Sequence, residues 1–166
     1  MRLRLTVSMV GLMGLLATVA CGGGGAAATS GGQAASWAFT GKTVDGAAFD
    51  SATLAGRPTV LWFWAPWCST CRGQTPDVQA VAERHAGEVN VVGVAGLGQN
   101  AAMRQFVSSA GVGLIKHVSD EAGEVWKQFQ VTQQSTYVLI DTAGTVVFRG
   151  YLDGDDLAKR VAGLAA

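Results

Sequence analysis

The stretch Arg57–Pro76, RPTVLWFWAPWCSTCRGQTP, decides which fold this chain adopts. It begins with an uninterrupted apolar run, Thr59–Trp64, which is typical of a central β-strand that is covered on both faces. After Cys68 and Cys71 the pattern becomes amphipathic, which predicts a helix over Ser69–His85. The stretch therefore predicts a buried strand that leads directly into a helix.

This order places Cys68 at the start of the helix, where unpaired backbone N–H groups and the helix dipole favour a thiolate. Cys71 follows one turn later, and a thiolate beside a second thiol is what dithiol–disulfide exchange requires. A disulfide that closes so short a loop stabilises a fold little, because the entropic gain grows with loop length. We therefore interpret the pair as reactive.

Two other kinds of site are disfavoured. A structural zinc site needs two further ligands at short spacing, but His85 and His117 lie 14 and 46 residues beyond Cys71, so both histidines are expected to be surface or packing residues. Residues 96–101 and Asp120 mimic a dinucleotide fingerprint, Gly96-x-Gly98-x-x-Ala101. Nucleotide-binding folds place that turn after their first strand, whereas it lies in mid-domain here. We expect a glycine-rich loop and no cofactor.

The N-terminal residues have the features of an export signal and a tether. Arg2 and Arg4 precede an apolar stretch, Leu5–Val19, which suits the core of a signal peptide and is shorter than the ~20 residues of a membrane span. A small residue before Cys21 resembles the lipobox of bacterial lipoproteins, in which this cysteine carries the lipid. Residues 22–36, GGGGAAATSGGQAAS, have the composition of a flexible linker.

We therefore predict a signal peptide at residues 1–20, a lipidated Cys21 with a tether to residue 36, and one domain at residues 37–166. The protein would be a membrane lipoprotein that faces outside the cytoplasm. Thr18 stands where the lipobox usually has leucine, so an ordinary secretory signal is the alternative. Without Arg2 and Arg4 the chain has 10 basic and 12 acidic side chains and no basic cluster, which disfavours nucleic acid as a partner.

Several motifs together resemble the thioredoxin superfamily. They are FWAPWCSTC, a proline five residues after Cys71, VVGVAGLGQ and VTQQSTYVLID. A hairpin signal at Asp45–Gly46 and an extra helix and strand over residues 99–118 make the chain similar to the TlpA/ResA/DsbE-like branch, and in particular to DsbF-type lipoproteins of mycobacteria. The resemblance implies an α/β thioredoxin-like fold: a mixed central sheet flanked by helices, with an N-terminal β-hairpin and an inserted helix–strand segment.

The resemblance also implies roles for individual residues. Cys68 would be the nucleophile, Cys71 the buried resolving cysteine, and the two would form the redox-active disulfide. The ring of Trp67 would pack beside them. The substrate loop and its supporting residues would be Pro66, Gln134, Ser135 and Thr136.

Three positions depart from the family pattern. Trp62 stands where thioredoxins have a buried aspartate, and Gln74 stands where this branch often has a glutamate. Ser135 stands where a cis-proline normally faces the disulfide. A cis bond before serine costs roughly 3–4 kcal/mol, against about 0.5–1 before proline, so the Gln134–Ser135 bond is either trans in a reshaped loop or cis and strained.

The sequence thus predicts an extracytoplasmic thiol–disulfide oxidoreductase that oxidises or isomerises disulfides in exported proteins, served by a redox partner in the membrane. One alternative is a membrane-anchored reductant for cytochrome c maturation. Another is a copper metallochaperone with Cys68 and Cys71 as soft ligands, which should have a histidine near residue 135; the sequence has none between residues 118 and 166. A third is an anchored binding domain with inert cysteines.

Overall fold

The computed structural model describes residues 37–166. The helix predicted at Ser69–His85 ends at Arg84, one residue early. In chain order the elements are β1 (Thr40–Thr43), β2 (Ala48–Asp50), the 3-10 turn η1 (Ser51–Leu54), β3 (Thr59–Trp64), α1 (Ser69–Arg84), β4 (Asn90–Ala95), α2 (Asn100–Ala110), β5 (Lys116–Ser119), α3 (Glu124–Gln128), β6 (Thr136–Ile140), β7 (Val146–Gly150) and α4 (Gly154–Ala165).

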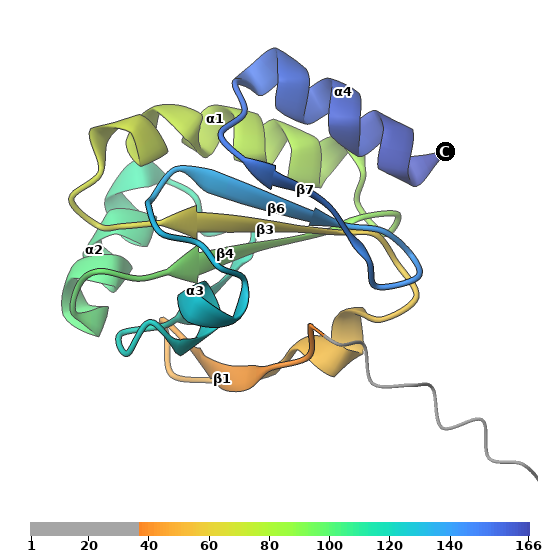
Figure 1. Ribbon diagram of the computed structural model, residues 1–166. Helices are drawn as coiled ribbons and strands as arrows, with labels where there is room; N and C mark the ends of the chain where they lie inside the picture. Colours follow the sequence, from red (N-terminus) through yellow and green to blue (C-terminus); the bar gives the residue numbers. More distant parts are fainter. Residues whose placement is uncertain (1–36) are drawn as a thin grey trace, which may run out of the picture. The chain divides into compact units, whose positions relative to one another are not determined.

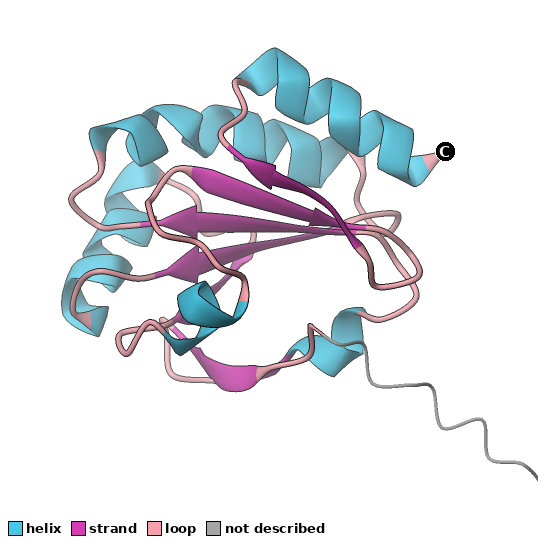
Figure 2. Cartoon of the chain, viewed as in Figure 1, coloured by secondary structure: helices cyan, strands magenta, loops and turns pink. Residues whose placement is uncertain are grey.

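The strands form one mixed seven-stranded sheet in the order β2-β1-β5-β4-β3-β6-β7. The central strands β3, β4 and β5 are parallel, whereas β6 runs antiparallel to β3 and β7 antiparallel to β6. Figure 1 shows α1 and α4 on one face of the sheet and α3 on the other, and Figure 2 shows the strands between these layers. This is the predicted thioredoxin-like α/β fold.

The apolar run of β3 divides the core into its two layers. Val60, Trp62 and Trp64 pack on the face covered by α1, α2 and α4. Leu61 and Phe63 point to the opposite face, where they meet the apolar side chains of α3. Because successive side chains of a strand alternate between faces, an uninterrupted apolar run is buried on both sides. All six residues of β3 are buried, as the sequence predicted.

The N-terminal hairpin and the inserted segment extend the sheet at one edge. Gly46 turns the chain between β1 and β2 with a φ of 92°, a conformation that glycine adopts at little cost. The inserted segment supplies α2 and β5, and β5 lies between β1 and β4. The hairpin is therefore attached to the rest of the sheet through the inserted strand.

Among residues 37–166, no helix has both the length and the apolar character needed to cross a membrane. The predicted signal peptide, the lipidated Cys21 and the tether at residues 22–36 lie outside the described residues.

Candidate active site

The end of β3 and the start of α1 hold a disulfide between Cys68 and Cys71, whose Cα atoms are 5.3 Å apart. Cys68 is the N-cap of α1, and its Sγ accepts a hydrogen bond from the backbone N–H of Cys71 at 2.9 Å. This sulfur therefore sits where the free N–H groups of the helix favour negative charge. Cys71 is fully buried, and Cys68 is 5% exposed.

Ser135 faces the disulfide from the loop that precedes β6. Its Oγ lies 3.3 Å from the Sγ of Cys68 and 3.3 Å from the Sγ of Cys71. Residues 37–166 contain no cis peptide bond, so the Gln134–Ser135 bond is trans, and Ser135 has a φ of 65°. The loop thus takes the reshaped trans form rather than the strained cis form. Serine rarely adopts a positive φ, so the surrounding structure must hold the residue there.

A neutral pair fills the position of the acid that thioredoxins have near the second cysteine. The indole N–H of Trp62 donates to Oε1 of Gln74 at 2.9 Å, and Nε2 of Gln74 donates to the carbonyl of Leu152 at 3.4 Å. Trp62 is fully buried and Gln74 is 5% exposed. The sequence did not indicate a role for Leu152, because it takes part through its backbone carbonyl, which every residue has.

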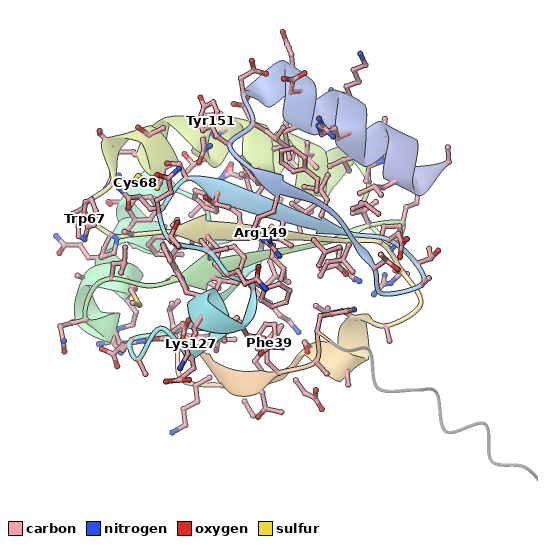
Figure 3. The ribbon with its side chains drawn as sticks, in the orientation of Figure 1. Phe39, Trp67, Cys68, Lys127, Arg149 and Tyr151 are labelled. Atoms are coloured by element: carbon pink, nitrogen blue, oxygen red, sulfur yellow. A yellow bond between two sulfur atoms is a disulfide. The ribbon has the colours of Figure 1, made fainter. Side chains whose placement is uncertain are left out.

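The rim of the site is formed by Pro66 and Trp67 against the loop after β4. Trp67 is 62% exposed and its indole N–H donates to the carbonyl of Leu97 at 2.9 Å. A Cβ at Gly98 would lie 2.5 Å from Cγ of Pro66, so this glycine allows the two loops to touch. Figure 3 shows Trp67 and Cys68 at the same end of the molecule. Trp67 is thus tied to the neighbouring loop.

Arg72 lies directly after Cys71 and is held by α2. Its guanidinium group donates to Oγ of Ser109 at 3.2 Å and lies 4.8 Å from the centre of the Phe106 ring. A cavity of about 360 Å³ opens beside it, between Trp67 and α2. Arg72 therefore supports a surface groove next to the disulfide.

Among the described residues, the remaining predicted side chains of the substrate loop, Gln134 and Thr136, make no hydrogen bond to either sulfur. Thr136 is buried, and its hydroxyl donates to the carbonyl of Gln133 at 3.0 Å. Gln134 is half-buried. The loop therefore places the Thr136 hydroxyl on its own backbone and leaves the Ser135 hydroxyl to face the sulfurs.

His117 is a buried packing residue beneath the end of β3. Its Nδ1 accepts from the indole N–H of Trp64 at 3.2 Å, and its Nε2 lies 2.9 Å from the carbonyl of Val112. Burial lowers the pKa of His117 from 6.5 to about 4, because the charged imidazolium loses its hydration. The ring is therefore neutral at physiological pH and supports Trp64.

The glycine-rich loop after β4 serves packing. A Cβ at Gly96 would lie 2.5 Å from Nε1 of Trp126, and Oδ2 of Asp120 accepts the backbone N–H of Trp126 at 2.9 Å. These residues are thus engaged within the domain, in agreement with the interpretation of residues 96–101 as a strand-to-helix loop. Within residues 37–166, no three His, Cys, Asp or Glu side chains lie close enough together to hold a metal ion.

A thioredoxin-like fold with a disulfide at the N-terminus of its first long helix defines a thiol–disulfide oxidoreductase. The sequence profile described as Redoxin matches residues 29–163, and the chain belongs to this family.

Three relatives show how far the similarity extends. The soluble secreted antigen MPT53 of Mycobacterium tuberculosis is 36% identical over 132 residues, which cover 77% of this chain and 75% of the relative. The solved structure of MTB dsbF, in mixed oxidized and reduced forms, is 46% identical with a TM-score of 0.74 and covers 78% of this chain and 97% of that chain. The solved structure of a secreted M. tuberculosis disulfide oxidoreductase homologous to E. coli DsbE is 34% identical with a TM-score of 0.71. The match covers 78% of this chain and 98% of that chain. The predicted family and class of activity are confirmed.

Proposed function

We propose that this thiol–disulfide oxidoreductase acts outside the cytoplasm and forms or rearranges disulfides in exported proteins, with Cys68 as the sulfur that meets the substrate. The difference between the two sulfurs carries this proposal. Cys68 caps α1 at the rim, whereas Cys71 is fully buried behind it. The relatives described as secreted support the location.

In the oxidising direction a substrate thiolate attacks Sγ of Cys68, the Cys68–Cys71 bond breaks, and its electron pair goes to Sγ of Cys71. A second substrate thiolate then attacks the substrate sulfur of the mixed disulfide and releases Cys68. Two electrons and two protons pass from two substrate thiols to the cysteine pair, and one substrate disulfide forms. In the reverse direction Cys71 is the resolving thiolate. A membrane redox partner would take the two electrons and restore the disulfide.

Single-cysteine variants test these roles. In a full-length Cys21→Ser background, reduced Cys71→Ser should accumulate a mixed disulfide with a substrate protein that carries a disulfide, because the Cys68 thiolate attacks that disulfide and the resolving thiol is missing. Cys68→Ser should accumulate little. A mixed disulfide that forms through Cys71 in the Cys68→Ser variant would contradict the assignment of the nucleophile. If neither variant forms a mixed disulfide, the result would favour the alternative in which the protein is an anchored binding domain with inert cysteines.

The reduction potential of the pair tests the direction. For a pair that oxidises its substrates, equilibration with glutathione should give a value nearer to the ~−120 mV of DsbA than to the ~−270 mV of thioredoxin, because a strong oxidant is one whose reduced form is stabilised. A potential near that of thioredoxin would instead favour the reductant for cytochrome c maturation. Copper analysis of the reduced protein tests the metallochaperone.

The membrane anchor is part of the same proposal. The signal at residues 1–20 would direct export, Cys21 would carry the lipid, and residues 22–36 would give the domain its reach. The full-length protein should partition into the detergent phase of a detergent–water mixture, and Cys21→Ala should move it to the aqueous phase. A protein that stays aqueous with Cys21 present would favour an ordinary secretory signal.

A further inference from the structure

The Ser135 hydroxyl is placed to respond to a change in the charge of either sulfur. Its Oγ is 3.3 Å from both Sγ atoms, and the residue is 7% exposed. A hydroxyl carries one hydrogen and therefore donates to one sulfur at a time. A thiolate accepts this hydrogen far better than a neutral disulfide sulfur does, because hydrogen bonds to charged groups are the strong ones. The contact therefore strengthens when the disulfide opens.

The two sulfurs differ in the hydrogen-bond donors that they contact besides Ser135. Sγ of Cys68 also accepts the backbone N–H of Cys71 at 2.9 Å and lies at the positive end of α1. Sγ of Cys71 is buried, and in the described part of the chain Ser135 is the one hydrogen-bonding group on it. A buried charge without a donor is costly. Cys71 therefore depends on Ser135 more than Cys68 does.

The polar groups around Cys71 offer no substitute for the serine. Trp62 and Gln74 are paired with each other, and Gln74 donates one of its two amide hydrogens to the carbonyl of Leu152. Among the described residues, neither side chain makes a hydrogen bond to Sγ of Cys71. The nearest cation in sequence, Arg72, is engaged with Ser109 and the Phe106 ring of α2. The family's buried acid is absent, since its position is occupied by Trp62.

We propose that Ser135 is a catalytic residue whose hydroxyl donates to the sulfur that carries the negative charge, first Cys71 and then Cys68; this rests on the proposed function. When a thiolate attacks Sγ of Cys68, the electron pair of the Cys68–Cys71 bond stays on Sγ of Cys71, and Ser135 donates to it. The serine keeps its proton throughout, and the two protons that the substrate thiols release as they become thiolates balance the two that the reduced cysteine pair takes up. When the second substrate thiolate releases Cys68, the hydroxyl turns to that sulfur.

Two variants without the hydroxyl test the proposal. Ser135→Gly suits the φ of 65°, and Ser135→Ala keeps a Cβ, so a defect common to both reports the lost hydroxyl rather than a changed backbone. Thr132→Ala removes an exposed hydroxyl from the same loop and is the matched control. The measurement is the rate constant for reduction of the oxidised full-length protein by dithiothreitol. Both Ser135 variants should react about ten-fold more slowly, the size expected for a hydrogen bond to a charged group. Wild-type rates in both would overturn the proposal.

A second measurement separates this proposal from the function on which it rests. In the full-length Cys21→Ser protein, alkylation rates against pH give the pKa of the Cys71 thiol in a Cys68→Ala variant and of the Cys68 thiol in a Cys71→Ala variant, without any substrate. Ser135→Gly should raise the pKa of Cys71 by about one unit, equivalent to the ten-fold effect, and that of Cys68 by less. Equal shifts, or none, would overturn the proposed asymmetry. A wild-type protein that exchanges no disulfides with protein substrates would refute the function and leave this titration interpretable.

Discussion

The two sides of the Cys68–Cys71 disulfide are built in different ways. One side is a continuous stretch, residues 65–72, in which the N–H of Cys68 bonds to the carbonyl of Ala65 at 3.1 Å and the N–H of Arg72 to the carbonyl of Cys68 at 3.2 Å. The other side is assembled from distant segments, among them the loop that carries Ser135. We call them the local side and the assembled side. The local side holds the reactive cysteine pair, and the assembled side holds the hydroxyl that faces it.

Backbone conformation shows the same difference. Three non-glycine residues among residues 37–166 have a positive φ: Leu97, Gln130 and Ser135. Two of them contact the local side, since Leu97 accepts the indole N–H of Trp67 and Ser135 touches both sulfurs. Such conformations persist only where the rest of the fold imposes them. The assembled side is therefore held by tertiary packing, and substitutions there should separate its contribution from that of the local side.

The largest expected effect comes from restoring the family's acid at position 62. Trp62→Asp should destabilise the fold by about 3–5 kcal/mol or more, because it removes a fully buried aromatic side chain and buries a carboxylate. Trp62→Phe, which keeps the ring and loses the bond to Gln74, is the control and should cost about 1–3 kcal/mol. Urea unfolding measures both. Equal stability of the two variants would show that the assembled side tolerates the acid.

His117 links the assembled side to Trp64 and gives stability a pH dependence. Its pKa of about 4 lies below the 6.5 of the unfolded chain, so the unfolded state binds its proton first as the pH falls. The contribution of neutral His117 to the free energy of unfolding is fully present above pH 6.5. It falls by about 3 kcal/mol as the pH is lowered from 6.5 to about 4. Urea unfolding of wild type and His117→Gln at several pH values measures it. The stability advantage of wild type should shrink through this window; parallel curves would contradict the prediction.

Gly98 tests the contact between Pro66 and the loop after β4. Gly98→Ala should lower the free energy of unfolding by about 1–3 kcal/mol, because its Cβ would lie 2.5 Å from Cγ of Pro66 and push the two loops apart. Since Pro66 lies two residues before Cys68, we also expect slower disulfide exchange. Gly163→Ala places a Cβ in open space within α4 and should stabilise by about 0.5–1 kcal/mol. Thermal unfolding and dithiothreitol reduction measure both variants. A Gly98→Ala protein as stable and as fast as wild type would show that this contact is loose.

The smallest expected effect concerns the shape of the substrate loop. Ser135→Pro should be compared with Ser135→Gly, since both lack the hydroxyl. Proline fixes φ near −65°, so the loop must leave its present conformation, with a φ of 65° at Ser135. Release of a peptide from its mixed disulfide should then change by a few-fold, equivalent to about 0.5–1.5 kcal/mol for one altered hydrogen bond. Stopped-flow exchange measures it, and indistinguishable rates would mean that the loop shape does not govern release.

Prediction from the sequence worked where the signal was local. The burial of β3, the helix that begins at Ser69 and the placement of Cys68 at its N-terminus all follow from one stretch of residues. The Asp45–Gly46 turn was also predicted from local sequence, because the turn needs a positive φ and glycine adopts one at little cost. The sequence also identified Ser135, but only as a departure from a pattern. Its two 3.3 Å contacts could not be read, because they join segments more than 60 residues apart.

The sequence by itself thus determined the buried strand β3, the helix that follows it and the position of Cys68 at the N-terminus of that helix, because hydrophobic alternation and helix-terminus electrostatics act over a few residues. The tertiary structure alone decided the trans form of the Gln134–Ser135 bond, the neutral pairing of Trp62 with Gln74 and the burial of His117 beneath Trp64. Each of these depends on which distant groups the packed sheet brings into hydrogen-bonding range. Local residue types do not specify such distances.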